Sequence, residues 1–276
     1  MNQVLSSNAV IPFPSLPRSL FGHTPAGDIG MRLFGKYESD LVIDFSTPNP
    51  AALITRILEL CTIDPENSLP EDFFLKLSLS KRLECLLVLA AGEERLPFNF
   101  PFHCAGCGQE LEMELTLDEI AEMQREADLI ETVEVGISGR FLSFRKPSGQ
   151  DQKRWTGRVF RNEKEAARAM IGSLAVAQDM AEHEGANEVD LVDEAMSEAD
   201  PLVNFLCRVD CSECGVPNEL LVDLSEVALG RLSRLQQQLI VMVHKLAAYY
   251  HWSEKEIFEV PYRRRKTYLD LILAGR

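Results

Sequence analysis

Four of the seven cysteines occur in two C-x2-C-G turns that are about a hundred residues apart. The first turn holds Cys104 and Cys107 in "HCAGCGQELEMEL", and the second holds Cys211 and Cys214 in "VDCSECGVPNELLVDL". Cysteine thiolates are zinc ligands, and a structural zinc site has four ligands in a tetrahedron, whereas one such turn supplies only two. We therefore predict that the two turns face each other as the halves of one zinc ribbon, with a single four-cysteine site.

The two segments also match beyond the cysteines. Alignment on the cysteines pairs Gly108 with Gly215 and Glu119 with Glu226. Each copy predicts a tight turn with glycine where the backbone takes a positive φ, then an extended stretch, then the acidic start of a helix. The repeat is explained if the chain builds one site from two separate pieces.

Other interpretations of the cysteines predict different chemistry. A shell of four thiolates favours a structural zinc, because a catalytic zinc keeps one position open for water or substrate. Paired disulfides or ordinary buried thiols are the remaining alternatives for these four residues. His103 could replace one cysteine, but its place beside Cys104 in a strand directs its side chain to the opposite face. A nucleobase deaminase would need an H-x-E element and a proline immediately before the cysteine pair, and neither pair has them.

The remaining candidates for chemistry are weaker. His183 in "HEG" lacks the second histidine of an H-E-x-x-H motif and lies in an acidic stretch, so we expect a solvated face there. Cys61, Cys85 and Cys207 are predicted to be small core residues. No Ser-His-Asp order, phosphate-binding glycine loop or pair of catalytic carboxylates can be singled out, so the sequence predicts that the protein is not an enzyme.

Composition narrows the class of partner and the compartment. The chain has 276 residues, a formal net charge of -15 and a pI near 4.8. Polyanions attract clustered Lys and Arg, so general binding to nucleic acid or to an anionic membrane is not expected, and a protein partner fits better. No apolar run approaches the roughly 20 residues that span a bilayer. Because an odd number of cysteines in C-x2-C pairs suits a reducing compartment, we expect the protein in the cytosol.

These patterns predict an α+β fold that is mainly helical, with a small zinc-ribbon β unit and a β-hairpin insertion. We expect an extended, partner-binding or disordered N-terminal arm over residues 1–49, since this part is rich in Pro and Gly. Helices and the first zinc knuckle follow over 50–127 and an insertion over 128–205. The second knuckle and the C-terminal helices are expected over 206–276.

The predicted insertion contains a hairpin, a basic part and an acidic part. Alternating strands around Ser138 and Gly139 predict its hairpin. Basic residues outnumber acidic ones over 140–168, whereas 179–200 contains no Lys or Arg. The acidic part is expected to be a solvated helix and loop, with a docking surface for a basic partner as the alternative.

A long helix is predicted after the second knuckle, starting at the cap Ser225. Its apolar residues recur at steps of four and three, which is a heptad seam. The seam runs for about three heptads, so packing on the chain's own helices is expected, and self-association through helices is the alternative. The seam residues are Ala228, Leu232, Leu235, Leu239, Met242, Leu246 and Tyr249.

The last segment predicts two short helices and a basic cluster. Ser253 and Glu256 form a capping box, the helix stops before Pro261, and a final helix starts at Tyr262. The basic cluster that follows is Arg263, Arg264, Arg265 and Lys266. In so acidic a chain, we expect this cluster to dock a carboxylate-rich protein surface rather than nucleic acid.

Several segments resemble one known family. They are "HKLAAYYHWSEKEIFEVPYRRRKTYLDLI", the split pair "HCAGCGQELEMEL" and "VDCSECGVPNELLVDL", "FRKPSGQDQKRW" and "SEADPLVNFL". Together they resemble baseplate proteins of contractile phage tails and phage-tail-like injection systems, the family of the tailed-phage baseplate hub subunit. The resemblance covers residues from about 50 to the end.

The resemblance implies a non-enzymatic structural or assembly component of a baseplate, with Cys104, Cys107, Cys211 and Cys214 as structural ligands. It implies other baseplate or hub proteins as partners, and a place in the bacterial cytosol and in the assembled particle. The alternative is a zinc-ribbon protein that binds nucleic acid or takes part in transcription. Basic residues around the ribbon would favour that alternative, but the charged residues in and beside the strands after the knuckles are acidic: Glu110, Glu112, Glu114, Glu219 and Asp223.

Overall fold

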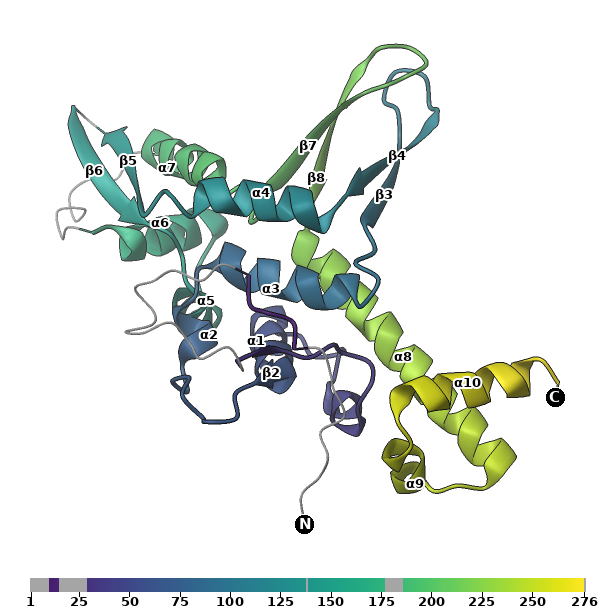
Figure 1. Ribbon diagram of the computed structural model, residues 1–276. Helices are drawn as coiled ribbons and strands as arrows, with labels where there is room; N and C mark the ends of the chain where they lie inside the picture. Colours follow the sequence, from purple (N-terminus) through teal and green to yellow (C-terminus); the bar gives the residue numbers. More distant parts are fainter. Residues whose placement is uncertain (1–9, 15–28, 138, 177–185, 276) are drawn as a thin grey trace.

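The protein has the mainly helical α+β fold that the sequence predicted, and its strands form small antiparallel hairpins (Figure 1). The computed structural model describes residues 10–14, 29–137, 139–176 and 186–275. Ser138 at the predicted hairpin turn, His183 and much of the predicted N-terminal arm lie outside the described residues.

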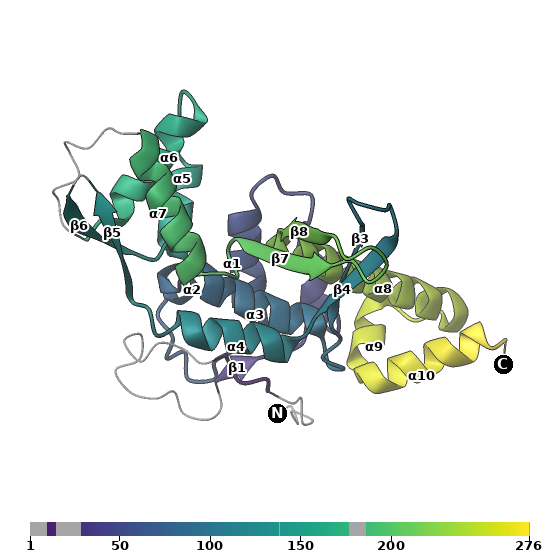
Figure 2. The ribbon, with the colours of Figure 1, turned by 90° about the horizontal axis from the view of Figure 1, so that it is seen from above.

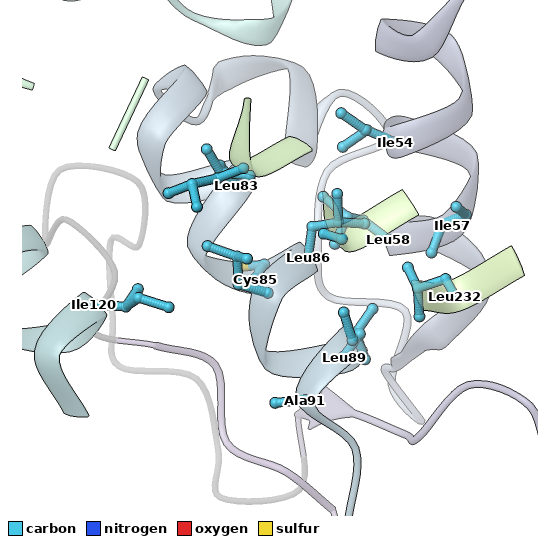
Figure 3. Close-up of a cluster of buried hydrophobic side chains, with 14 of the residues drawn as sticks. Ile54, Ile57, Leu58, Leu83, Cys85, Leu86, Leu89, Ala91, Ile120 and Leu232 are labelled. Atoms are coloured by element: carbon cyan, nitrogen blue, oxygen red, sulfur yellow. The ribbon is translucent and has the colours of Figure 1, made fainter. Parts of the chain in front are cut away.

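The largest core lies among α1 (Pro50–Cys61), α3 (Leu79–Ala91) and the first half of α8 (Leu224–Tyr250). Figure 3 shows side chains from these helices, among them Leu58, Leu86 and Leu232, in one buried cluster. Short α2 (Phe73–Lys76) packs beside α1. The cysteines of α1 and α3 are fully buried, as predicted for Cys61 and Cys85, whereas Cys207 is half-buried.

Two hairpins leave this body and carry the cysteine turns at their tips (Figure 1). The first pairs β3 (Phe98–His103) with β4 (Glu110–Leu115), and the second pairs β7 (Phe205–Asp210) with β8 (Pro217–Val222). A helix follows each hairpin directly, α4 (Leu117–Ala127) after β4 and α8 after β8. Both hairpins therefore rise from a strand–helix junction on the same body.

The helix caps at these junctions differ from the prediction at one residue. Thr116 and Glu119 form a reciprocal capping box at the start of α4. At α8 the cap is Asp223, whose carboxylate accepts hydrogen bonds from the backbone N–H groups of Ser225 and Glu226. The predicted cap Ser225 is thus already inside the helix, because Asp223 offers an acceptor two residues earlier.

The insertion forms a second, smaller core. The hairpin of β5 (Thr132–Ile137) and β6 (Arg140–Arg145) packs against α6 (Glu163–Leu174) and α7 (Ala186–Ala199). Between them, α5 (Gly149–Thr156) leads back toward α1 and α2. The described half of the predicted acidic stretch is therefore mostly the helix α7. Figure 2 shows α5, α6 and α7 grouped at the end of the molecule opposite α9 and α10.

Buried ion pairs lie at both ends of the insertion, and one of them joins it to α3. Lys81 is fully buried, and its Nζ lies 2.8 Å from Glu84 and 2.7 Å from Asp128, where α4 ends. Asp200, which follows α7, is also buried, with Lys146 Nζ 3.9 Å away. Neither carboxylate oxygen of Asp200 has a hydrogen-bond partner within the described part of the chain. Burial raises the pKa of this carboxyl group, because the charged form loses its hydration.

The described end of the predicted N-terminal arm is packed rather than extended. β1 (Gly30–Met31) pairs with β2 (Thr62–Ile63), and η2 (Glu38–Val42) is a turn of 3-10 helix. Gln236 of α8 donates from Nε2 to the backbone carbonyls in and beside η2, at 2.7 and 2.8 Å. This segment therefore belongs to the core, because its apolar side chains supply part of the surface that covers α1 and α8.

The heptad seam of α8 is covered mainly by the chain itself. Five of its seven residues are buried, Leu235 is half-buried, and Tyr249 is 54% exposed. The second half of the helix packs with α9 (Glu254–Glu259) and α10 (Tyr262–Leu273) in a third cluster. The predicted capping box of Ser253 and Glu256 is present at α9. Among the described residues, no helix is both long and apolar enough to cross a bilayer.

Three side chains of the predicted basic docking cluster are exposed, and the fourth is buried. Arg263, Arg264 and Lys266 are exposed, but Arg265 is only 3% exposed. Its guanidinium lies over the rings of Phe258 and Tyr262, 4.7 and 5.5 Å from their centroids. Arg265 Nη2 also donates to the carbonyl of Lys36. The prediction that all four side chains form one surface is therefore wrong for Arg265, which holds α10 against the N-terminal segment.

Candidate metal centre

The two cysteine turns have the same backbone geometry. In the first, the N–H of Gly108 donates to the carbonyl of Cys104 at 2.9 Å, and in the second, Gly215 donates to Cys211 at 2.8 Å. The glycines have φ values of 75° and 71°, in the left-handed region that side chains with a Cβ rarely adopt. The predicted positive φ is confirmed at both positions. Each turn directs its two thiols to the tip of its hairpin.

The hairpin tips meet, and the structure brings together all four predicted cysteines. Cys104 Sγ lies 3.6 Å from Cys214 Sγ, and Cys107 Sγ lies 3.7 Å from Cys211 Sγ. All four sulfurs lie within 4.8 Å of one another. A disulfide bond would need about 2 Å, so these are free thiols. The cluster can hold a metal ion, and each close sulfur pair joins one hairpin to the other.

Each turn contributes one inner and one outer thiol. Cys104 and Cys211, the first cysteine of each pair, are each 3% exposed. Cys107 and Cys214, the second of each pair, are exposed. The site therefore lies at the surface of the hairpin tips, and a metal ion can enter without opening the body of the protein.

The four thiols cannot ionise independently. The backbone N–H of Cys107 and other donors lower the pKa of Cys104 to about 6, so this sulfur ionises first. At Cys214 the N–H of Val216 lowers the pKa, but partial loss of hydration and the three neighbouring thiols raise it to about 12. Adding a second negative charge within 4 Å of the first is unfavourable unless a cation shares the site. The chemistry of this donor set therefore favours a bound metal cation.

Asn218 links the two hairpins beside the cluster. Its Oδ1 accepts from the N–H of Ala105 in the first turn at 2.9 Å. Its Nδ2 donates to the carbonyl of Val216 at 2.9 Å and to that of Val209 at 3.3 Å, both in the second hairpin. The side chain is 7% exposed. Asn218 thus positions the two turns relative to each other, although it is not one of the four cysteines of the cluster.

Close approach of the turns also depends on Gly106. A Cβ at this position would lie 2.8 Å from Cγ2 of Val216 and 3.3 Å from the sulfur of Cys214. Both distances are shorter than ordinary contacts, so any larger residue would push the turns apart. The first turn needs glycine at this point because the second hairpin lies against it.

The sequence interpretation missed Asn218 and Gly106, although the repeat contained a signal for each. Asn218 aligns with Leu111, and Gly106 aligns with Glu213, so each is a place where the two copies differ in character. The asparagine occurs in only one copy because a single side chain bonds groups in both hairpins.

The other predicted candidates lie outside the cluster. His103 is exposed at the end of β3, paired with Glu110, and is not among the residues that could share a metal ion with the thiols. Burial raises the pKa of Cys61 to about 12 and raises that of Cys85 further, as expected for inert core thiols. Within the described part of the chain, the four cysteines are the only cluster of His, Cys, Asp and Glu that could hold a metal.

No protein-family model matches this chain, and no curated protein or solved structure is significantly similar to it. The resemblance to baseplate proteins therefore stays a prediction from the sequence segments in which it was found.

Proposed function

We propose that the four cysteines bind one structural zinc ion. A zinc–sulfur bond of about 2.3 Å places neighbouring sulfurs of a tetrahedral site about 3.8 Å apart. The two shortest sulfur–sulfur distances, 3.6 and 3.7 Å, are close to that spacing. Cys104, Cys107, Cys211 and Cys214 would supply all four bonds, so no position remains for water or substrate. This closed thiol set is the observation that carries a structural rather than a catalytic role.

Metal analysis of the purified protein tests this site. We expect about one zinc per chain, lost in Cys211→Ser together with several kcal/mol of folding stability. Cys207→Ser is the matched control, since Cys207 is a half-buried cysteine in β7 of the same hairpin and lies outside the cluster. Full zinc content and unchanged melting in Cys211→Ser would refute the four-cysteine site. Iron instead of zinc, recognised by its colour, would refute the choice of metal, because tetrahedral thiolate sites accept both.

We propose further that the protein is a non-enzymatic structural or assembly component of the baseplate of a contractile phage-tail-like particle. The sequence segments that resemble baseplate proteins support this proposal, as does a metal site suited to holding hairpins rather than to catalysis. The zinc would fix two hairpins from distant parts of the chain in one rigid unit. Other baseplate or hub proteins would then bind to surfaces whose relative positions do not change.

The nucleic-acid alternative is less well supported by the charges near the cluster. Glu110, Glu112, Glu114 and Glu219 are exposed on the two hairpins, where phosphate groups would have to approach. Arg208, a basic residue of the same hairpins, is paired with Glu219 at 2.9 Å. Because phosphate binding requires unpaired positive charge, this surface favours a protein partner.

Deletion of the gene in its native host, with electron microscopy of sheathed particles, tests the baseplate proposal. We expect few or no intact contractile particles in the deletion strain. Reversal of Arg263, Arg264 and Lys266 to Glu should leave the protein folded, since exposed charges contribute little to stability, but should reduce assembly. Arg56→Glu, an exposed charge on α1, is the control. Normal numbers of contractile particles in the deletion strain would refute the baseplate function.

A further inference from the structure

The loop between α5 and α6, residues 157–162, presents apolar side chains to solvent. Val159 is 100% exposed and Phe160 is partly exposed, and the flanking Arg158 and Arg161 are exposed. A fully exposed valine beside a partly exposed phenylalanine leaves apolar surface in water that burial against another molecule would stabilise. The loop therefore has the composition of a contact that is completed only by another molecule.

Hydrogen bonds at both ends hold this loop in one conformation. The N–H of Arg158 donates to the carbonyl of Trp155 at 3.0 Å, and that of Arg161 donates to the carboxylate of Glu165 at 2.9 Å. Asn162 caps α6 through its side chain. Because the loop is ordered before it meets a partner, binding would lose less conformational entropy than a flexible loop would.

A cleft of about 580 Å³ lies between the body and the second zinc hairpin. Its apolar walls include Leu221 of β8, which is 66% exposed, and Val203, which is 44% exposed. Asp223 and Glu226 at the start of α8 also line it, and both are exposed. Arg82 also lines the cleft, but it is 2% exposed and donates to Gln152, Thr55 and the carbonyl of Ala51. The exposed charges of the cleft are therefore the two carboxylates, which together with Leu221 and Val203 fit an apolar segment that carries positive charges.

The loop and the cleft are complementary, and both belong to the same chain. Residues 140–168 carry nine Lys and Arg against three Asp and Glu, although the whole chain has a net charge of -15. The basic part of one copy would therefore be attracted to the acidic surface of another. Since Val159 is fully exposed, the loop does not occupy the cleft of its own chain.

We propose that the loop 157–162 of one copy docks in this cleft of a second copy. Val159 and Phe160 would contact the apolar walls, and Arg158 and Arg161 would face Asp223 and Glu226. Each copy carries one loop and one cleft, so the contact can join two copies reciprocally or continue as a ring. The contact involves neither the zinc ligands nor the resemblance to baseplate proteins, so it can be tested separately from the proposed function.

Analytical ultracentrifugation of the zinc-loaded full chain over a wide concentration range tests the proposal. We expect self-association that weakens with added salt, because exposed charges are screened. Val159→Asp should lower the association constant by about tenfold or more, since it places a carboxylate in an acidic apolar cleft. Phe141→Asp is the matched control, because Phe141 is 80% exposed on β6 of the same insertion but lies outside the loop.

A charge exchange identifies the two partners of the contact. The loop variant Arg158→Glu with Arg161→Glu and the cleft variant Glu226→Arg should each associate weakly alone, and mixing them should restore a heteromeric complex. Monomers at every concentration would refute the proposal. So would self-association that Val159→Asp leaves unchanged, or that Phe141→Asp weakens equally. Association lost only in Val241→Asp, on the exposed face of α8, would assign the interface to that helix instead and refute the loop contact.

Discussion

Replacement of Asn218 by alanine should weaken the junction between the two cysteine hairpins without removing any of the four thiols. Asn218 makes three hydrogen bonds to backbone groups, one to Ala105 in the first turn and two within the second hairpin. A neutral hydrogen bond contributes about 0.5–1.5 kcal/mol net. The bond to Val209 is the longest at 3.3 Å, and the carbonyl of Val216 keeps a second donor in the N–H of Cys211.

The expected loss is therefore about 2 kcal/mol of unfolding free energy, below the sum of three full-strength bonds. For a protein of this size, that loss lowers the melting temperature by about 4–8 °C. Zinc affinity should fall by about 10- to 100-fold, as it does when groups that orient metal ligands are removed. Differential scanning calorimetry measures the first quantity, and competition with a chromophoric chelator measures the second.

Asn204→Ala is the control for this prediction. Asn204 is exposed and bonds only the hydroxyl of Ser197 among the described residues, so its loss should change stability by less than about 0.5 kcal/mol. Equal effects of the two variants would mean that the measured change is not specific to the hairpin junction. Wild-type melting and zinc affinity in Asn218→Ala would refute the view that this side chain holds the turns together.

Three further predictions concern single positions. Gly106→Ala should lower both the melting temperature and the zinc affinity. In the double variant, Val216→Ala should partly restore both, because it removes the methyl group that clashes with the new Cβ. No restoration would contradict the contact. Asp200→Asn should raise the melting temperature at neutral pH. Burial raises the pKa of Asp200, so the wild type loses stability as pH rises through that pKa, and the gain should vanish in acid; a gain that is constant with pH would contradict this cause. Arg265→Met should destabilise the protein by about 2 kcal/mol more than Arg264→Met in urea unfolding, because only Arg265 is buried; equal losses would contradict its structural role.

The short-range features of this chain could be predicted from the sequence because they depend on neighbours along the chain. The positive φ values at Gly108 and Gly215, the strands after the turns and the capping box of Ser253 with Glu256 follow from residues a few positions apart. The helical cap at Asp223 instead of Ser225 shows the limit of this reasoning. Both residues are good caps, and only the end of β8 determines which of them comes first.

Contacts between distant segments could not be predicted in the same way. Arg265 was assigned to a basic surface by its neighbours, but its burial depends on Lys36 and Phe258, which the fold brings beside it. The described part of the N-terminal segment was expected to be an extended arm, but Gln236 and the apolar side chains of the core hold it in place. In both cases the partner lies in another element, so no local pattern identifies it.

The sequence by itself determined which four thiols form the candidate metal site, because two C-x2-C-G turns supply four thiols and a lone turn cannot complete a tetrahedral site. It also determined the mainly helical α+β class, through the periodicity of the apolar residues. The tertiary structure alone decided how the turns meet: Cys104 lies beside Cys214 rather than Cys211, Asn218 joins the hairpins, and Gly106 allows their close approach. These features depend on how the two hairpins leave the body, where α4 and α8, the helices that follow them, both pack against α3.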